Sequence, residues 1–141
     1  MTYKHILVAV DLSEDSVILV NKAAALASAC DAKLSLIHID VNFTDMYTGF
    51  MEINFAETQN AMLESAQKKI KTLVESLNFP ITETIVSSGD LCNEIGHAID
   101  NLNIDLVICG HHKDFWSKLL STSRQLINEA AVDMLIVPLE D

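Results

Sequence analysis

The chain has 141 residues, of which 50% are hydrophobic and 6% aromatic, and its twenty acidic and nine basic side chains give a net charge of −11. This length predicts one domain over residues 1–141, and the aliphatic composition favours a layered α/β fold over an aromatic-rich β-sandwich. Because so acidic a surface repels phosphate groups, we expect neither direct nucleic-acid binding nor binding to anionic membranes.

The start of the chain and its cysteines indicate a cytoplasmic protein. Met1 leads straight into an apolar strand pattern without a signal-peptide cleavage site, and no apolar run is long enough to span a bilayer. Three cysteines, Cys30, Cys92 and Cys109, cannot all pair, and none lies in a C-x-x-C spacing. We therefore expect free, mainly structural thiols in a reducing compartment.

The first forty residues predict a strand, a helix and a second strand. Residues 3–10 end in a continuous apolar run, which is typical of a strand covered on both faces. Ser13 is the expected N-cap of a helix whose first turn holds Glu14 and Asp15. Residues 33–40 form the second predicted strand. The helix between them is expected to turn these side chains toward the core: Val17, Val20, Ala24 and Ala27, with Cys30 as a further candidate.

The middle of the chain predicts a long loop, two helices and a third strand. Residues 41–55 show no sustained period, and a long amphipathic helix follows up to Asn78. After Pro80, residues 81–87 are the third predicted strand, and Gly89-Asp90 supplies a turn and the next N-cap. The residues at helical spacing are Met62, Ala66, Ile70, Leu73 and Leu77 in the first helix and Leu91, Ile95, Ala98, Ile99 and Leu102 in the second.

The last third of the chain predicts two more strands around a final helix. Residues 105–109 form a short buried strand that ends at Gly110, a helix is expected around residues 121–131, and residues 134–137 form the last strand before Pro138. Five strands alternating with four helical segments predict an α/β fold with a parallel sheet and right-handed crossovers.

Ligands of such a sheet bind beyond the carboxyl ends of its strands. If the first and fourth strands are central neighbours, Asp11 meets residues 110–113 there, with His38, Asp40 and Val41 close by. The histidines invite a metal reading, but their spacing matches no known ligand set, so ordinary loop histidines are favoured and no metal is expected. Neither a G-x-S-x-G elbow nor a Walker A loop is present, and no catalytic residue is predicted.

Several runs resemble the universal stress protein A subfamily of the universal stress proteins. They span the whole chain: residues 4–11, 36–41, 47–49, 109–118 (Cys-Gly-His-His-Lys-Asp-Phe-Trp-Ser-Lys) and 133–138. The resemblance implies a doubly wound sheet in the order 3-2-1-4-5 with helices on both faces, a homodimer, and stress-induced expression in the cytoplasm.

Nucleotide-binding members of this family carry a glycine motif after the fourth strand, in which two residues separate the first and second glycines and nine separate the second and third, with Ser or Thr following. Gly110 matches the first glycine, whereas Lys113 and Ser123 stand at the other two and Arg124 replaces the Ser or Thr. Since glycine lets backbone amides close on phosphates, their loss disfavours ATP binding. Asp11 and Val41 match ribose and adenine positions, so with Gly110 they form a remnant pocket.

Two functions of different classes follow. The first is a non-enzymatic homodimer that supports survival under starvation, DNA-damaging or other stress, acts through protein contacts and holds no cofactor. The second is an adenine-nucleotide-binding switch or weak ATPase that uses the pocket around Asp11, Val41 and Gly110. A third possibility is that an anion smaller than ATP binds to Lys113, Arg124 and the hydroxyls of residues 121–123. Such cations, however, usually pair with neighbouring carboxylates.

Two further expectations concern the end of the chain. In the order 3-2-1-4-5 the last strand is an edge, and its apolar residues Met134, Leu135, Ile136 and Val137 predict a homodimer formed by pairing two such edges. Ser121, Thr122 and Ser123 cluster at the start of the last predicted helix, where a phosphate would meet the helix dipole favourably. We therefore predict a phosphorylation site in residues 121–123.

Overall fold

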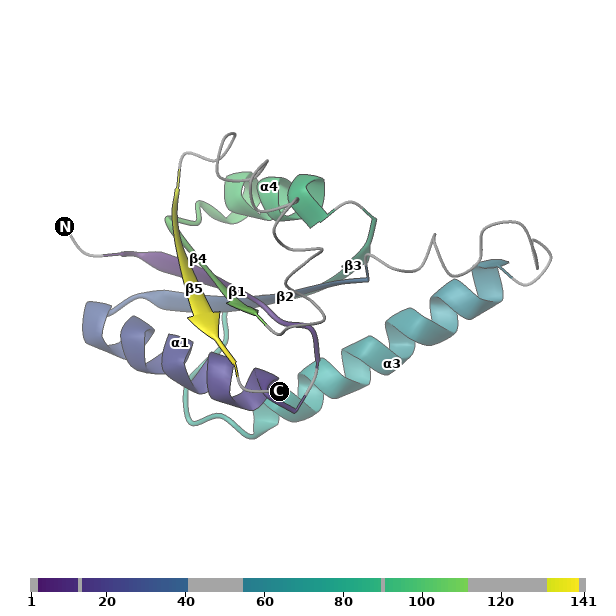
Figure 1. The fold of residues 1–141 in the computed structure, drawn as a ribbon, viewed down its shortest axis with the longest axis horizontal. Helices are drawn as coiled ribbons and strands as arrows, with labels where there is room; N and C mark the ends of the chain where they lie inside the picture. The colour runs from purple at the N-terminus through teal and green to yellow at the C-terminus, as the bar shows by residue number, and fades with distance from the viewer. Residues whose placement is uncertain (1–2, 13, 41–54, 90, 112–131, 140–141) are drawn as a thin grey trace.

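The computed structural model describes residues 3–12, 14–40, 55–89, 91–111 and 132–139. Within them, five strands form one all-parallel sheet in the order β3-β2-β1-β4-β5 (Figure 1), which confirms the predicted fold class. The strands are β1 (His5–Ala9), β2 (Lys33–Asp40), β3 (Thr84–Ser88), β4 (Leu106–His111) and β5 (Asp133–Pro138). The helices are α1 (Ser16–Cys30), α3 (Phe55–Glu75) and α4 (Leu91–Leu102).

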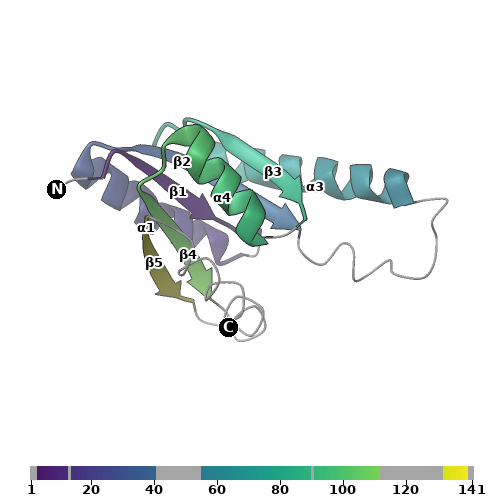
Figure 2. The ribbon, with the colours of Figure 1, turned by 90° about the horizontal axis from the view of Figure 1, so that it is seen from above.

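Helices cover both faces of the sheet, as expected. In Figures 1 and 2, α1 and α3 lie on one face and α4 lies on the other. Each face has its own hydrophobic core, because alternate strand residues point to opposite sides. On the first face Ile6, Val8, Leu34, Leu36 and Ile108 pack against α1 and α3; on the second Leu7, Ile37, Val107 and Cys109 pack against α4. The helix predicted around residues 121–131 lies outside the described residues.

Helix α1 differs from its prediction at its start and on its buried face. It begins at Ser16, so Glu14 and Asp15 precede the helix rather than occupying its first turn. Asp15 takes the N-cap position without a side-chain hydrogen bond, and Ser13 lies outside the described residues. Val17, predicted to be in the core, is 43% exposed. The core-facing residues are Ser16, Leu19, Val20, Ala23 and Ala27, because a helix that is apolar around most of its circumference does not mark one face.

The boundaries of α3 and β3 also shift. Helix α3 begins at Phe55, the last residue of the predicted loop, and ends at Glu75 instead of Asn78. Strand β3 covers Thr84–Ser88 rather than residues 81–87. The Thr82 N–H donates to the Leu34 carbonyl at 2.8 Å and the Leu36 N–H donates to the Glu83 carbonyl at 3.0 Å, so the chain already contacts β2 before the regular ladder starts.

A buried histidine joins four segments at the amino ends of the strands. His5 is 7% exposed, and its Nδ1 lies 2.9 Å from the Leu102 carbonyl oxygen. Because a carbonyl only accepts, Nδ1 donates, and the fully buried Ser35 hydroxyl donates to Nε2 at 2.7 Å. The Asp105 carboxylate accepts from the backbone N–H groups of Lys4 and His5 at 2.8 and 3.2 Å. These contacts fix β1, β2 and the end of α4 to the segment that precedes β4.

No helix in the described parts of the chain is both long and apolar enough to cross a membrane.

Candidate functional site

The candidate site lies where β1 and β4 end side by side. The two strands pair in parallel, with Ala9 opposite Cys109, and β1 and β4 are central neighbours, as the site prediction required. Helix α1, which follows β1, and helix α4, which precedes β4, lie on opposite faces of the sheet (Figure 2). Such a reversal of winding direction opens a crevice at the carboxyl ends, and it brings Asp11 and Gly110 to the same edge of the sheet.

Asp11 follows β1 in a sharply turned segment. Its Oδ1 accepts a hydrogen bond from the Ser16 hydroxyl at 3.2 Å, which ties the strand end to the first turn of α1. Leu12 between them has a φ of 64°, a left-handed conformation that is costly for a leucine. Strained backbone persists where the surrounding structure holds it, and it clusters at functional sites. The half-buried Asp11 carboxylate is thus held in place at the edge where a ligand would bind.

Gly110 at the end of β4 faces the side chains of its own chain. A Cβ atom built on Gly110 would lie 2.6 Å from Leu139 Cδ1 and 3.3 Å from Leu19 Cδ2. The first of these distances is far inside van der Waals contact, so a larger residue here would make the side chain of Leu139, the residue after β5, turn away. The space beside this backbone is therefore filled by leucine side chains from α1 and from the end of the described chain.

His38 also lies at this edge, in β2. Its Nδ1 donates to the Val10 carbonyl at 2.9 Å, which leaves Nε2 as the acceptor nitrogen. The contact links β2 to the end of β1 and gives the half-buried ring a structural role. Among the residues that the structure describes, no three His, Cys, Asp or Glu side chains gather closely enough to hold a metal ion.

The remaining predicted site residues fall in segments that the structure leaves undescribed. Val41 lies in residues 41–54, and Lys113, Ser123 and Arg124 lie in residues 112–131, together with the hydroxyl cluster of residues 121–123. The side chain of Asp40 is likewise outside the described set. The structure therefore brings together Asp11, Gly110 and His38 of the predicted site.

The described cysteines match the prediction of free, structural thiols. Cys30 and Cys109 are both unpaired with another cysteine, and Cys109 is buried in the core beneath α4. Burial raises the pKa of the Cys109 thiol to about 12, because a thiolate would lose its hydration there. Cys109 is therefore unreactive near neutral pH. The Cys92 side chain lies outside the described residues.

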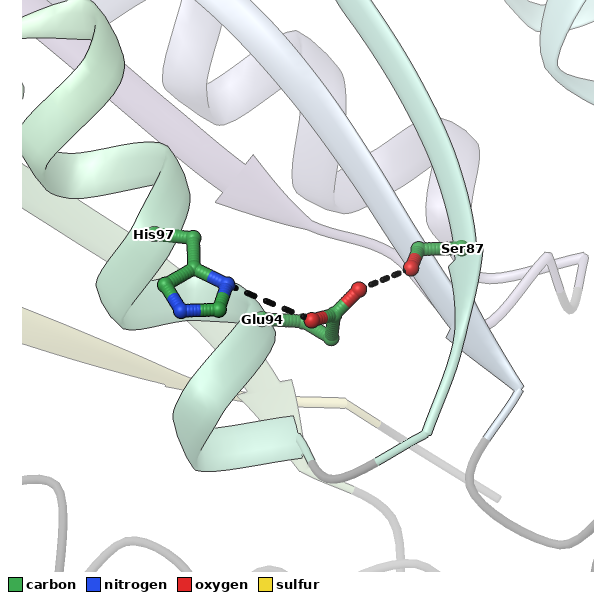
Figure 3. A network of polar contacts seen from close by, with 3 residues as sticks. All are labelled: Ser87, Glu94 and His97. Carbon is green, nitrogen blue, oxygen red and sulfur yellow. Dashed lines mark hydrogen bonds and ion pairs between the residues drawn. The ribbon is translucent and has the colours of Figure 1, made fainter.

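Sequence reasoning missed a polar network between β3 and α4. In Figure 3 the Ser87 hydroxyl donates to one oxygen of Glu94, while His97 Nδ1 lies 3.5 Å from the other. The carboxylate stands between the serine and the histidine, so the imidazole does not reach the hydroxyl as it does in a serine hydrolase. The network thus fastens the first turns of α4 to the end of β3. The Glu-x-x-His spacing predicts the contact between Glu94 and His97 on one helix, but no pattern in the sequence predicts that Ser87 joins them.

Comparisons with known proteins decide the family. A model of the universal stress protein family matches residues 2–138. The chain belongs to the universal stress protein family. It is 52% identical over 141 residues to universal stress protein A of Escherichia coli strain K12, covering 100% of this chain and 98% of that protein. It is 51% identical over 139 residues to the universal stress protein A homolog of Haemophilus influenzae, covering 99% of each.

Solved structures share this fold at lower identity. A hypothetical protein whose biochemical function was assigned from its structure superposes with a TM-score of 0.76 at 22% identity, covering 100% of this chain and 99% of that one. A universal stress protein in complex with cAMP superposes with a TM-score of 0.59 at 21% identity, covering 98% of each chain. These likenesses establish the doubly wound architecture for this family member.

Proposed function

We propose that this universal stress protein is a non-enzymatic, cytoplasmic homodimer that supports survival under starvation, DNA damage or other stress through contacts with proteins. The observation that carries the proposal is the packing at Gly110. Leu139 and Leu19 occupy the space beside the one motif glycine that the chain retains. A glycine in a phosphate loop serves to admit a ligand, whereas this one admits a leucine. The substitutions Lys113 and Ser123 at the other two glycine positions support the same conclusion.

Dimerisation through β5 is supported by its position and exposure. In the described part of the chain, β4 is the one strand that pairs with β5, and Leu135 is 43% exposed on this edge. Asp133 and Pro138 limit the strand at its ends but leave residues 134–137 without a charge. Pairing two such edges about a two-fold axis would satisfy their backbone groups and cover Leu135. Leu135→Lys should shift the sedimentation pattern toward monomer or insoluble protein, and a monomeric wild type would refute the dimer.

The alternative is a switch that binds an adenine nucleotide, with or without weak ATPase activity. It is favoured by the structural relative in complex with cAMP and by the strained Leu12, which holds Asp11 at the strand edge. In this alternative Asp11 would accept from the ribose hydroxyls and Val41 would contact the base. Leu139 would then have to leave its place beside Gly110, which its flexible side chain permits.

Calorimetric titration with MgATP separates the two proposals. We expect no binding with a dissociation constant in the low micromolar range, about −8 kcal/mol. The triple variant Lys113→Gly, Ser123→Gly and Arg124→Ser should bind more tightly than the wild type, because it restores the phosphate loop. Tight binding by the wild type would establish the nucleotide switch instead. An unchanged triple variant would show that the lost glycines are not the reason for weak binding.

The phosphorylation site predicted in residues 121–123 is part of the same proposal. Phosphate added at the start of a helix gains from its N–H groups and dipole. Mass spectrometry of protein from stressed cells should locate phosphate on Ser121, Thr122 or Ser123. Phosphate found only on other residues would remove this site from the proposal.

A further inference from the structure

Strand β3 forms the second edge of the sheet in the described part of the chain. In the described residues β3 pairs with β2 on one side and with no strand on the other. Its five residues, Thr-Ile-Val-Ser-Ser, include neither a charge nor a proline. Natural edge strands usually carry such features, because their outward N–H and C=O groups otherwise accept another strand. The part of β3 that precedes Ser88 thus offers its outward backbone groups to a further strand.

An apolar groove runs along this same edge. It has a volume of about 510 Å³ and lies between α3 and β3, with Ile70 and Val74 on the helix and Val86 on the strand. Helix α3 passes beside β3 and extends beyond it (Figure 2), so the helix forms one wall of the groove. Since side chains of a strand alternate between two faces, every second residue of an added strand would point toward this wall.

The charges at the groove indicate the chemistry of the partner. Glu75 lines the groove at the end that also includes Thr84, and the exposed Glu83 immediately precedes Thr84. Lys71 lies one helical turn before Glu75, away from this end. Two carboxylates therefore flank the start of β3 in a chain of net charge −11. A cationic side chain at this end of a bound segment would be attracted, whereas an acidic one would be repelled.

We propose that β3 and the α3 groove bind an extended segment of a partner protein, which adds to the sheet as a sixth strand. The segment carries apolar side chains at alternate positions, which enter the groove beside Ile70, Val74 and Val86. A lysine or arginine follows at the end that meets Glu75 and Glu83. Main-chain hydrogen bonds supply the affinity in this mode of recognition, and the side-chain pockets supply the specificity.

A second copy of this chain fits the edge less well than such a partner. The residues around its own β3, 81–90, include no lysine or arginine that could meet Glu75 and Glu83. The site is also independent of the proposed dimer, because β3 and β5 are opposite edges of the sheet. Pairing through β5 would leave one β3 edge open on each protomer.

The experiment uses the full chain and a synthetic peptide of about six residues, a common strand length. In the peptide, valine alternates with threonine and two arginines stand at one end. We expect amide exchange in Thr84–Ser88, followed by NMR, to slow roughly tenfold when the peptide is added to about 1 mM. A peptide of the same composition in scrambled order should give no protection.

Charge reversal tests which end of the groove selects the partner. The double variant Glu75→Lys, Glu83→Lys should lose the arginine peptide and bind a peptide that ends in two glutamates. The matched control is Glu64→Lys, Asp100→Lys, which makes the same charge change at exposed positions of α3 and α4 that do not line the groove. The control should keep the arginine peptide. The inference is overturned by protection that is absent from β3, by protection at β5 instead, or by an equal loss in the control.

Discussion

At the amino ends of the strands, polar side chains close on backbone groups and on each other, whereas at the carboxyl ends the chain keeps strained and closely packed backbone. His5 uses both ring nitrogens and Asp105 uses both carboxylate oxygens. At the opposite end, His38 donates one ring hydrogen bond to Val10, Leu12 is left-handed, and Gly110 is pressed by Leu139. The hydrogen bonds at the amino ends of the strands therefore stabilise the domain. The residues at the carboxyl ends contribute less to stability and can form a binding site.

The largest expected effect separates the two histidines. His5→Ala should lower the free energy of unfolding by about 3 kcal/mol, because it opens a cavity and leaves the Ser35 hydroxyl and Leu102 carbonyl without their partner. His38→Ala removes one hydrogen bond of a half-buried ring and should cost about 1 kcal/mol. Urea unfolding of both variants measures the difference. Equal losses would mean that the two ends contribute alike.

The second prediction concerns the packing at Gly110. Gly110→Ala should cost about 1 kcal/mol, because Leu139 must turn away and Leu19 must yield by a few tenths of an ångström. Leu139→Ala should make the same substitution nearly neutral, since the added methyl group would then have room. A double-mutant cycle of unfolding free energies gives the coupling. Additive effects would show that Leu139 does not fill this space in solution.

A smaller effect is expected at the strand end itself. Ser16→Ala removes the hydroxyl that donates to Asp11 at 3.2 Å, and should lower the free energy of unfolding by roughly 0.5 kcal/mol. Thr72→Ala is a useful reference, because its hydroxyl donates to the Lys68 carbonyl at 3.1 Å within α3 and is exposed. Chemical denaturation of the two variants should show the larger loss for Ser16. A larger loss for Thr72 would argue against a structural role for the Asp11 contact.

The smallest expected effect concerns Tyr3, at the amino ends of the strands. The Tyr3 hydroxyl donates to Asp133 at 2.7 Å, and this hydrogen bond to a carboxylate raises the pKa of Tyr3. Because the folded pKa is the higher one, the stabilisation is complete below the ordinary tyrosine pKa and is lost as the pH rises through the raised value. The stability difference between the wild type and Tyr3→Phe should therefore shrink as the pH rises above the ordinary tyrosine pKa of about 10. A difference that grows with pH would contradict this assignment.

Much of the fold could be predicted from uninterrupted apolar runs. Strands β1, β4 and β5 lie within one or two residues of their predicted bounds, because short uninterrupted apolar runs with polar residues on both sides leave few alternatives. The face of α1 was predicted only in part. Val20 and Ala27 are buried as expected, but alanines and valines surround the helix, and only tertiary packing buries Ser16 instead of Val17. The order of the strands rested on family resemblance, because periodicity carries no information about neighbours.

The sequence predicted which edge of the sheet carries the candidate site, but not the side-chain contacts within it. The rule for carboxyl ends of parallel strands placed Asp11 and Gly110 together correctly. The contact between Gly110 and Leu139 joins the ends of two different strands, and no local pattern marks it. The Ser87 contact with Glu94 likewise joins two different elements, β3 and α4. The pairing of Glu94 with His97 could have been predicted, because they lie three residues apart on one helix.

The shared volume at the end of β4 has an evolutionary consequence. Positions 110 and 139 are coupled, because a larger residue at one removes room from the other. Family members with a small residue at the position of Leu139 should tolerate alanine at the position of Gly110, or should have space there for atoms of a ligand. The size of that one residue then sorts relatives into those that pack the crevice with their own chain and those that leave it open.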